Sequence, residues 1–144
     1  MKLLEMSLEE ILLDTLEYYG EDEHRYCKKN SECTYSPATL GLELFSEGCA
    51  IGRLLTPEIA LKFDNELGFT GIQDIVNHYI YALEFWDKEM ANFLNSEIVF
   101  FSQLQMLHDR KLIKNGELDW EGDFILNELI NEYSFDKSKF TKWL

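Results

Sequence analysis

The chain has 144 residues, of which 46% are hydrophobic and 14% aromatic, and its formal net charge is −14 at pH 7. This apolar content excludes a disordered chain, and the length suits one domain, so we expect residues 1–144 to form a single globular unit. The negative charge disfavours direct binding to nucleic acid and to anionic membranes, because both present phosphates. It favours a basic protein partner, although an acidic surface also aids solubility.

No apolar run approaches the roughly 20 residues that cross a membrane, and Glu5 comes too early for a secretory signal. We therefore expect a cytoplasmic protein. In that compartment thiols stay reduced, which argues against a disulfide framework built from the three cysteines. Burial, metal binding or catalysis must then account for them.

The first helix is predicted from Ser7-Leu8-Glu9-Glu10, a capping box in which Ser7 and Glu10 bond to each other's backbone N–H groups. Gly20 is the expected helix end. Residues 21–46 then lose helical periodicity, and a loop of this length is typically functional or held by something other than helix packing. Within it, residues 32–35 are predicted to pair with the residues around Cys49 as a short β-hairpin.

Further helices are predicted from periodicity and capping residues in the remainder of the chain. We expect helix starts at Thr56-Pro57-Glu58, at a capping box over residues 70–73, at Asn95 or Ser96, and at Asp119. A further helical segment is expected over residues 83–94, and a helix end at Lys114-Asn115-Gly116. The predicted fold is mainly α: a small bundle of five or six helices with a short β-hairpin at the cysteine loop. Aromatic residues near the C-terminus predict docking of the tail, on this domain or on a partner.

The stretch from Glu47 to Leu55, with sequence EGCAIGRLL, joins the irregular loop to the first long apolar run. Gly48 and Gly52 permit a tight backbone path there. Arg53 is the only basic residue between Lys29 and Lys62, so we expect a carboxylate to pair with it and hold the loop. The binding residues predicted from the sequence are Tyr35, Cys49, Arg53 and His108.

A zinc site is one interpretation of the cysteines, because His24, Cys27, Cys33 and Cys49 supply the four ligands of a closed tetrahedral site. Only His24 and Cys27 have the usual ligand spacing, which counts against it. The favoured interpretation is that buried thiols pack the loop onto the core, since free cysteine behaves as a small hydrophobe. A reversible Cys33–Cys49 disulfide is a third alternative.

A cysteine enzyme is a further interpretation, with Cys49 as nucleophile, His108 as base and Asp109 as the orienting group. A thiol at a helix start has a lowered pKa, which favours this interpretation. Geometry opposes it, because His108 lies on an apolar helix face and the adjacent Asp109 is expected to point about 100° away. We therefore expect a satisfied histidine at the edge of the core.

Three motifs follow one another along the chain: a Cys-x-Tyr segment (Cys33-Thr34-Tyr35), a Cys-Ala-Ile-Gly-Arg run (residues 49–53) and a later Leu-His-Asp segment (residues 107–109). In this pattern, over about residues 8–112, the chain resembles a group of small uncharacterised proteins of bacteriophages and bacteria. The resemblance implies a phage or mobile-element setting, where small acidic proteins often bind or inhibit host factors. It transfers no catalytic role. From the residues themselves we expect no cofactor, with zinc as the alternative described above.

The function expected from the sequence is a non-enzymatic, cytosolic interaction protein, such as an inhibitor of a host or defence protein. One alternative is a small-molecule binding protein, for instance for a nucleotide signal, with Tyr35, Tyr79 and Trp86 lining a cleft. The other alternative is the cysteine enzyme. The net charge opposes an anionic ligand, and aromatic residues at helical spacing are usually core.

Overall fold

The computed structural model describes residues 2–30, 32–68, 70–79 and 88–144, and in them the protein is mainly α-helical, as predicted. Five of the described helices have nine residues or more, which agrees with the expected count of five or six. The helices are α1 (Lys2–Glu5), α2 (Leu8–Glu21), α3 (Pro57–Leu67), α4 (Ile72–Asp74), α5 (Lys88–Ser96), α6 (Ile98–Asp109) and α7 (Trp120–Tyr133).

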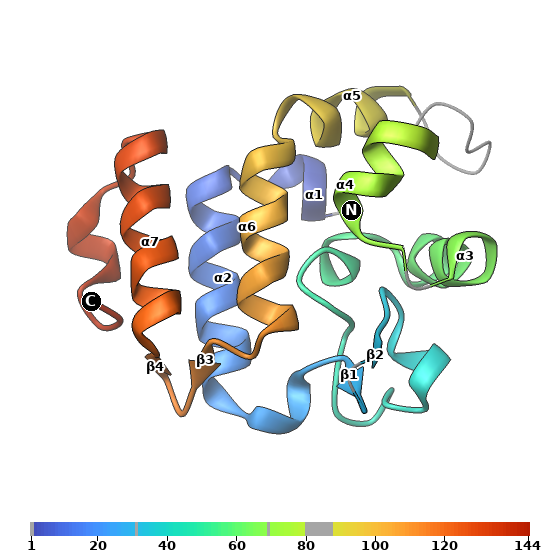
Figure 1. Ribbon diagram of the computed structural model, residues 1–144, viewed down its shortest axis with the longest axis horizontal. Helices are drawn as coiled ribbons and strands as arrows, with labels where there is room; N and C mark the ends of the chain where they lie inside the picture. The colour runs from blue at the N-terminus through green and yellow to red at the C-terminus, as the bar shows by residue number, and fades with distance from the viewer. Residues whose placement is uncertain (1, 31, 69, 80–87) are drawn as a thin grey trace.

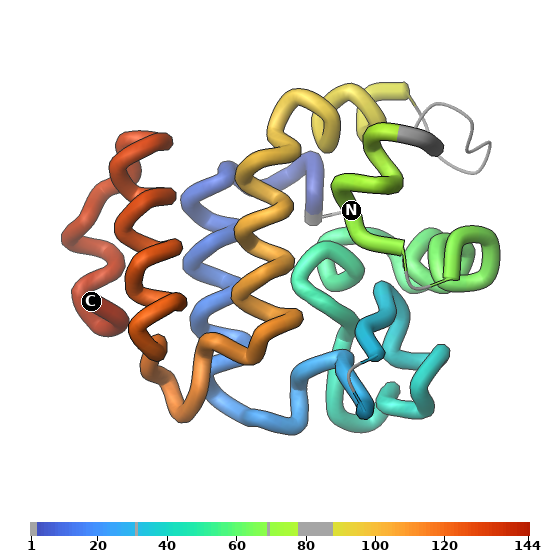
Figure 2. The backbone as a smooth tube through the Cα atoms, in the orientation of Figure 1, coloured from blue at the N-terminus to red at the C-terminus, as the bar shows by residue number. Residues whose placement is uncertain are grey.

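Three helices, α2, α6 and α7, lie side by side and form one half of the molecule (Figure 1). The other half contains α3, α4 and the loop that carries the cysteines, and the same arrangement is visible in the backbone trace (Figure 2). One core of buried apolar side chains extends through both parts. Its fully buried members include Ile11, Leu16, Leu54, Phe63, Phe100 and Leu104. No helix in the described ranges is both long enough and apolar enough to span a membrane.

Helix α2 starts where the sequence predicts, with both bonds of the Ser7–Glu10 capping box present. It does not end at Gly20, because the helix continues to Glu21. Gly20 instead permits a close approach: a Cβ atom there would lie 3.2 Å from the Cα atom of Gly116. This glycine therefore seats a later hairpin against α2.

A short hairpin at the cysteine loop is present, but its pairing differs from the prediction. Strand β1 (Lys28–Lys29) pairs antiparallel with β2 (Glu32–Cys33), so the partner of β2 is not the stretch around Cys49. Asn30 supports this local turn because it adopts the left-handed conformation, with φ of 50°, which asparagine tolerates well.

The assignment of Lys114-Asn115-Gly116 as a helix end was wrong. Helix α6 ends at Asp109, and Ile113–Lys114 (β3) pairs with Glu117–Leu118 (β4) in a second hairpin. Asn115 and Gly116 form its two-residue turn with φ of 53° and 77°, the conformation that an Asn-Gly pair favours. The Asn-Gly signal thus prevailed over the helical periodicity.

Two further predicted helix starts also differ. Gly71, not Thr70, precedes α4, which leads into a π-helical turn over Ile75–Tyr79, and the Thr70 hydroxyl donates to the Leu67 carbonyl. Ser96 ends α5 instead of capping α6, and no side chain caps that helix start. The predicted segment over residues 83–94 lies partly outside the described residues, and its described part is α5.

The C-terminal segment docks on this domain, which was one of the two predicted outcomes. After α7 the chain forms a short 3₁₀ helix, Lys137–Phe140, and buries Phe140 and Trp143. Lys139 forms an ion pair with Glu9 of α2. Both apolar burial and this charge contact therefore attach the tail to the helix bundle.

Candidate functional site

The turn at Tyr35 is held by a buried carboxylate from α3. Asp64 accepts hydrogen bonds from the backbone N–H groups of Tyr35, at 2.9 Å, and Ser36, at 2.8 Å, and from the Thr39 hydroxyl at 2.7 Å. A buried carboxylate is tolerated when its oxygens are satisfied in this way. Asp64 therefore provides the polar anchor of the irregular loop.

Gly48 and Gly52 approach the same turn from the other side. A Cβ atom at Gly48 would lie 2.4 Å from the Tyr35 carbonyl oxygen, and one at Gly52 would lie 1.9 Å from it. Gly48 also has a φ of 125°, which only glycine adopts without strain. The tight path expected for the Glu47–Leu55 stretch is confirmed, and its reason is backbone contact with Tyr35.

Arg53 is buried, and its guanidinium group contacts two carboxylates and an aromatic ring at close range. It lies 2.9 Å from Asp14 and 3.4 Å from Glu47, and its Cζ atom is 3.7 Å from the centroid of the Tyr18 ring. The predicted pairing of Arg53 with a carboxylate is therefore confirmed. Burial against an aromatic face strengthens such a cation's contacts, and it fixes the loop to α2.

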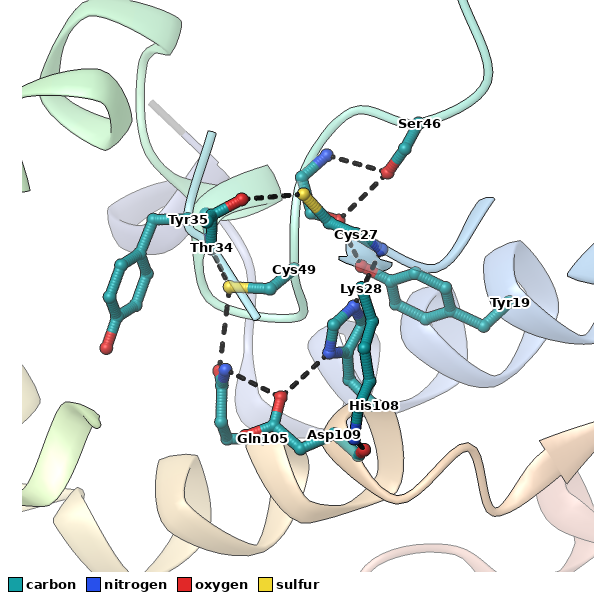
Figure 3. Close-up of polar contacts among 12 residues, drawn as sticks. Tyr19, Cys27, Lys28, Thr34, Tyr35, Ser46, Cys49, Gln105, His108 and Asp109 are labelled. Atoms are coloured by element: carbon teal, nitrogen blue, oxygen red, sulfur yellow. Dashed lines mark hydrogen bonds and ion pairs between the residues drawn. The ribbon is translucent and has the colours of Figure 1, made fainter. Parts of the chain in front are cut away.

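His108 belongs to a buried polar cluster between α6 and the cysteine loop (Figure 3). Its Nε2 atom accepts a hydrogen bond from the Cys27 backbone N–H at 3.0 Å, so the ring proton resides on Nδ1 and is donated to Asp109 Oδ1 at 2.9 Å. The rings of Tyr19 and Tyr26 pack against the imidazole. Burial lowers the pKa of His108, which keeps the ring neutral, although Asp109 acts in the opposite direction.

Cys49 lies beside this cluster but does not contact His108. Its thiol donates to Gln105 Oε1 at 3.7 Å and accepts from the Gly52 N–H at 3.4 Å, and Gln105 in turn donates to Asp109 (Figure 3). Burial raises the pKa of the Cys49 thiol well above its usual value. The expectation of a lowered pKa at a helix start was wrong, because the thiol is fully buried.

The predicted catalytic set is thus only half assembled. The expectation that Asp109 points away from His108 was wrong, since the two side chains are hydrogen-bonded. The Nε2 lone pair, however, already accepts the hydrogen bond from the Cys27 backbone N–H. His108 therefore has no free acceptor atom that could take a proton from Cys49. In this arrangement the histidine joins two segments of the core and does not act as a base. The expectation of a satisfied histidine is confirmed.

The four predicted zinc ligands do not converge. His24 is exposed and bonds to Asp22 at 3.0 Å, whereas Cys27 bonds to the Thr34 hydroxyl at 3.1 Å. All three cysteines are free thiols, so the Cys33–Cys49 disulfide is not formed. Cys27 and Cys49 are fully buried, as the favoured interpretation predicts, and Cys33 is partly exposed.

A different trio comes closer: the ligand atoms of Cys33, His108 and Asp109 lie within 4.8 Å of one another. Zinc binds the lone pair of a neutral imidazole nitrogen. In His108 the Nε2 atom already accepts a hydrogen bond from the Cys27 N–H, and Nδ1 carries the ring proton. A metal bound at Nδ1 would move that proton to Nε2, where it would face the Cys27 N–H. This protonation pattern does not fit a metal site.

Arg53 also lines an open pocket of about 550 Å³, which we call the Arg53 pocket. Its apolar walls come mainly from prolines and aliphatic side chains, and its rim carries three carboxylates. The pocket is lined by Glu5, Ser36, Pro37, Ala38, Glu43, Ser46, Glu47, Gly52, Arg53, Leu55, Thr56, Pro57 and Ala60.

A neighbouring hollow of about 450 Å³ shares Glu43, Ser46, Glu47 and Arg53 with this pocket. Leu44 and Phe45 line that hollow, and they are 92% and 55% exposed. Two adjacent large apolar side chains on a loop are costly to leave in water. They form an exposed apolar pair beside the pocket.

The other predicted binding residues are placed differently. Tyr35 is 3% exposed, and its hydroxyl donates to the Thr70 carbonyl, so it packs in the core instead of lining a cleft. Cys49 and His108 are also buried. The side chain of Tyr79 and all of Trp86 lie outside the described residues. Of the predicted set, only Arg53 lines the pocket.

Sequence reasoning missed Asp64 and Gln105, which organise the loop and the polar cluster. Both carried a signal, because each falls in register with the apolar face of its helix: Asp64 follows Ala60 by four residues, and Gln105 follows Phe101 by four. A polar residue in such a position is either exposed or hydrogen-bonded inside the protein, and here both are hydrogen-bonded.

Comparison of the chain with protein-family models, with curated proteins and with solved structures gave no match.

Proposed function

We propose that this protein is a non-enzymatic binding protein that acts by holding a basic protein partner. The observation that carries the proposal is the Arg53 pocket, whose apolar walls, carboxylate rim and adjacent exposed side chains Leu44 and Phe45 suit a protein contact. Apolar anchors in a pocket supply most of the energy of a typical interface, and the surrounding charges select the partner.

The state of the polar cluster supports a non-enzymatic role. The thiols of Cys27 and Cys49 are buried with raised pKa values, and both ring nitrogens of His108 are already hydrogen-bonded. A nucleophile needs a thiolate, and a general base needs a free acceptor. Neither requirement is met by these residues in this arrangement.

Charge supports a basic partner. The chain carries −14, and three of its acidic residues, Glu5, Glu43 and Glu47, line the pocket, whose arginine is paired with Asp14 and Glu47. Such a field attracts lysine and arginine side chains and speeds association. The resemblance to phage and bacterial proteins names the expected setting, the cytosol of a bacterium, where the partner would be a host or defence protein that this protein inhibits.

A photo-crosslinking residue in place of Phe45, in the full chain, tests the proposal in bacterial lysate. We expect capture of a discrete basic protein that weakens as salt is raised, whereas the same residue in place of exposed Leu144 captures none. Leu44→Ser with Phe45→Ser should abolish retention of that protein. If no macromolecule is retained, or if the double variant retains it equally, the proposal is wrong.

A small-molecule role is the second candidate, because about 550 Å³ is within the range of ligand pockets. The three rim carboxylates weigh against a nucleotide, whose phosphates they would repel. A thermal-shift screen separates the two functions, since a ligand at a hundredfold excess over its Kd stabilises a protein by about 2.7 kcal/mol. A shift with a small molecule that Glu43→Gln alters would favour this second candidate.

A further inference from the structure

A separate groove is lined by residues of α6 and α7 and shares none of them with the Arg53 pocket. The two helices are antiparallel: the rings of Phe100 and Tyr133 meet at one end, and Arg110 pairs with Glu121 at the other. The groove has a volume of about 570 Å³ and is lined by Val99, Gln103, Glu128, Asn131, Glu132 and Tyr133.

The apolar side chains along this helix pair are exposed. Val99 is 60% exposed at one end of the groove, and on α7 Phe124 and Trp120 are 61% and 79% exposed. Phe124 precedes the groove residue Glu128 by one helical turn, and Trp120 precedes Phe124 by another, so the three share one stripe of α7. The stripe therefore extends the groove toward the β3–β4 hairpin.

The length of this surface matches a short helix. From Trp120 to Glu132, α7 rises about 18 Å at 1.5 Å per residue, which is a little over three turns. A partner helix of that length presents apolar side chains at positions i, i+3 or i+4, and i+7 along one face. Trp120 and Phe124, one turn apart on α7, and Val99 in the groove offer apolar contacts along this length.

The charges of the groove identify the partner. Glu128 and Glu132 are one turn apart, and neither has an ion-pair partner in the described part of the chain. Arg110, at the other end of the helix pair, is already paired with Glu121. A second copy of this chain would bring the same carboxylates and a charge of −14, so self-association is opposed.

We infer that the α6–α7 groove is a docking site for a basic amphipathic helix. Its apolar face would cover Val99, Phe124 and Trp120, and its lysine or arginine side chains would meet Glu128 and Glu132. This inference is independent of the Arg53 pocket, because the two surfaces share no lining residue.

The test uses the full-length protein and a labelled synthetic peptide of 14 leucine and lysine residues with leucine at i, i+3, i+4 and i+7. A scrambled peptide of the same composition, which has the charge but no apolar face, is the control. Anisotropy titration should show binding at least about tenfold tighter for the amphipathic peptide. Equal affinity for both peptides would overturn the inference, since it would mean that net charge alone drives binding.

Variants then locate the site. Glu128→Gln with Glu132→Gln should weaken binding about fivefold or more, and Phe124→Ser should do the same without any change of charge. The charge-matched control, Glu17→Gln with Glu66→Gln, alters exposed carboxylates on α2 and α3 and should leave the affinity unchanged. Equal effects of the two double variants would refute the site. Sedimentation that shows a dimer lost in Phe124→Ser would also overturn it, in favour of a second copy as occupant.

Discussion

The guanidinium group of Arg53 lies over the ring of Tyr18, with its Cζ atom 3.7 Å from the ring centroid. Tyr18 belongs to α2, and its hydroxyl accepts from the backbone N–H of Glu47, which also pairs with Arg53. Helix and loop are thus joined by a ring, a cation and a carboxylate. Because Arg53 and Glu47 line the Arg53 pocket, this joint also sets the shape of that pocket.

Replacing Arg53 with alanine should therefore destabilise the fold. The substitution leaves Asp14 and Glu47 without their cation and removes packing from Tyr18, and since both carboxylates keep some access to water we expect a loss of about 2 kcal/mol. Urea unfolding measures the change. The control is Arg110→Ala, which breaks an exposed pair with Glu121 and should cost less than about 1 kcal/mol. If Arg53→Ala is as stable as the wild type, Arg53 does not hold the loop, and a direct role in binding is indicated.

Gly52→Ala should be among the most damaging single changes in the chain. The added methyl group would lie 1.9 Å from the Tyr35 carbonyl oxygen, and that backbone is held on its other side by Asp64, so relief requires the loop to move. We expect a loss of about 3 kcal/mol or more in the free energy of unfolding.

Gly71→Ala is the matched control, because in the described part of the chain a methyl group added there would meet no atom within 4 Å beyond its chain neighbours, and the φ of −68° suits any residue. It should stay within about 1 kcal/mol of the wild type. Similar melting of the two glycine variants would contradict the close contact with Tyr35.

Local parts of this fold were readable from the sequence. The caps at Ser7, Thr56 and Asp119 are all formed, because a capping side chain and its target are within three residues of each other. The tight path at Gly48 and Gly52 followed from residue type alone. Where two local signals competed, as at Asn115-Gly116, the turn signal prevailed over periodicity.

The candidate site could be predicted only in its residue types. Cys49, His108 and Asp109 do come near one another, but the direction of the imidazole depends on Cys27, 81 residues away, and on the packed ring of Tyr19. A single hydrogen bond at Nε2 decides whether this histidine is a base or a structural link. Contacts of such sequence separation are fixed by packing, which periodicity and spacing do not encode.

The stability of the protein should fall as pH drops through the range in which histidine titrates. Burial lowers the pKa of His108 below its usual value near 6.5, so the unfolded chain takes up a proton first as the pH falls. The free energy of unfolding therefore shows no loss from His108 above about pH 6.5, and it decreases as the pH falls below that value.

Melting temperatures between pH 7.5 and 5.5 test this dependence. The decline should be smaller in His108→Gln, which cannot take up the proton, and it should persist in His24→Gln, which alters an exposed ring. Equal slopes in the wild type and His108→Gln would show that this histidine does not couple to folding.

The thiols should be poorly reactive in the native protein. Burial raises the pKa of Cys27 and Cys49, and burial together with the Asp109 charge raises the pKa of Cys33 to about 12. At pH 7.5 we expect iodoacetamide to modify all three at least about tenfold more slowly than in the chain unfolded by urea, because only the thiolate reacts. Cys33 should be the fastest of the three, since it is partly exposed.

Asp109→Asn should accelerate the reaction of Cys33, because it removes a negative charge that opposes the thiolate. Asp74→Asn, which changes an exposed carboxylate on α4, should leave the rate unchanged. Mass spectrometry of the labelled peptides gives the rate for each cysteine separately. Rapid labelling of Cys49 in the folded protein would contradict the non-enzymatic proposal. A fully buried thiol with a raised pKa cannot react quickly, so rapid labelling would mean that the loop from Glu47 to Leu55 opens and exposes Cys49 as a nucleophile.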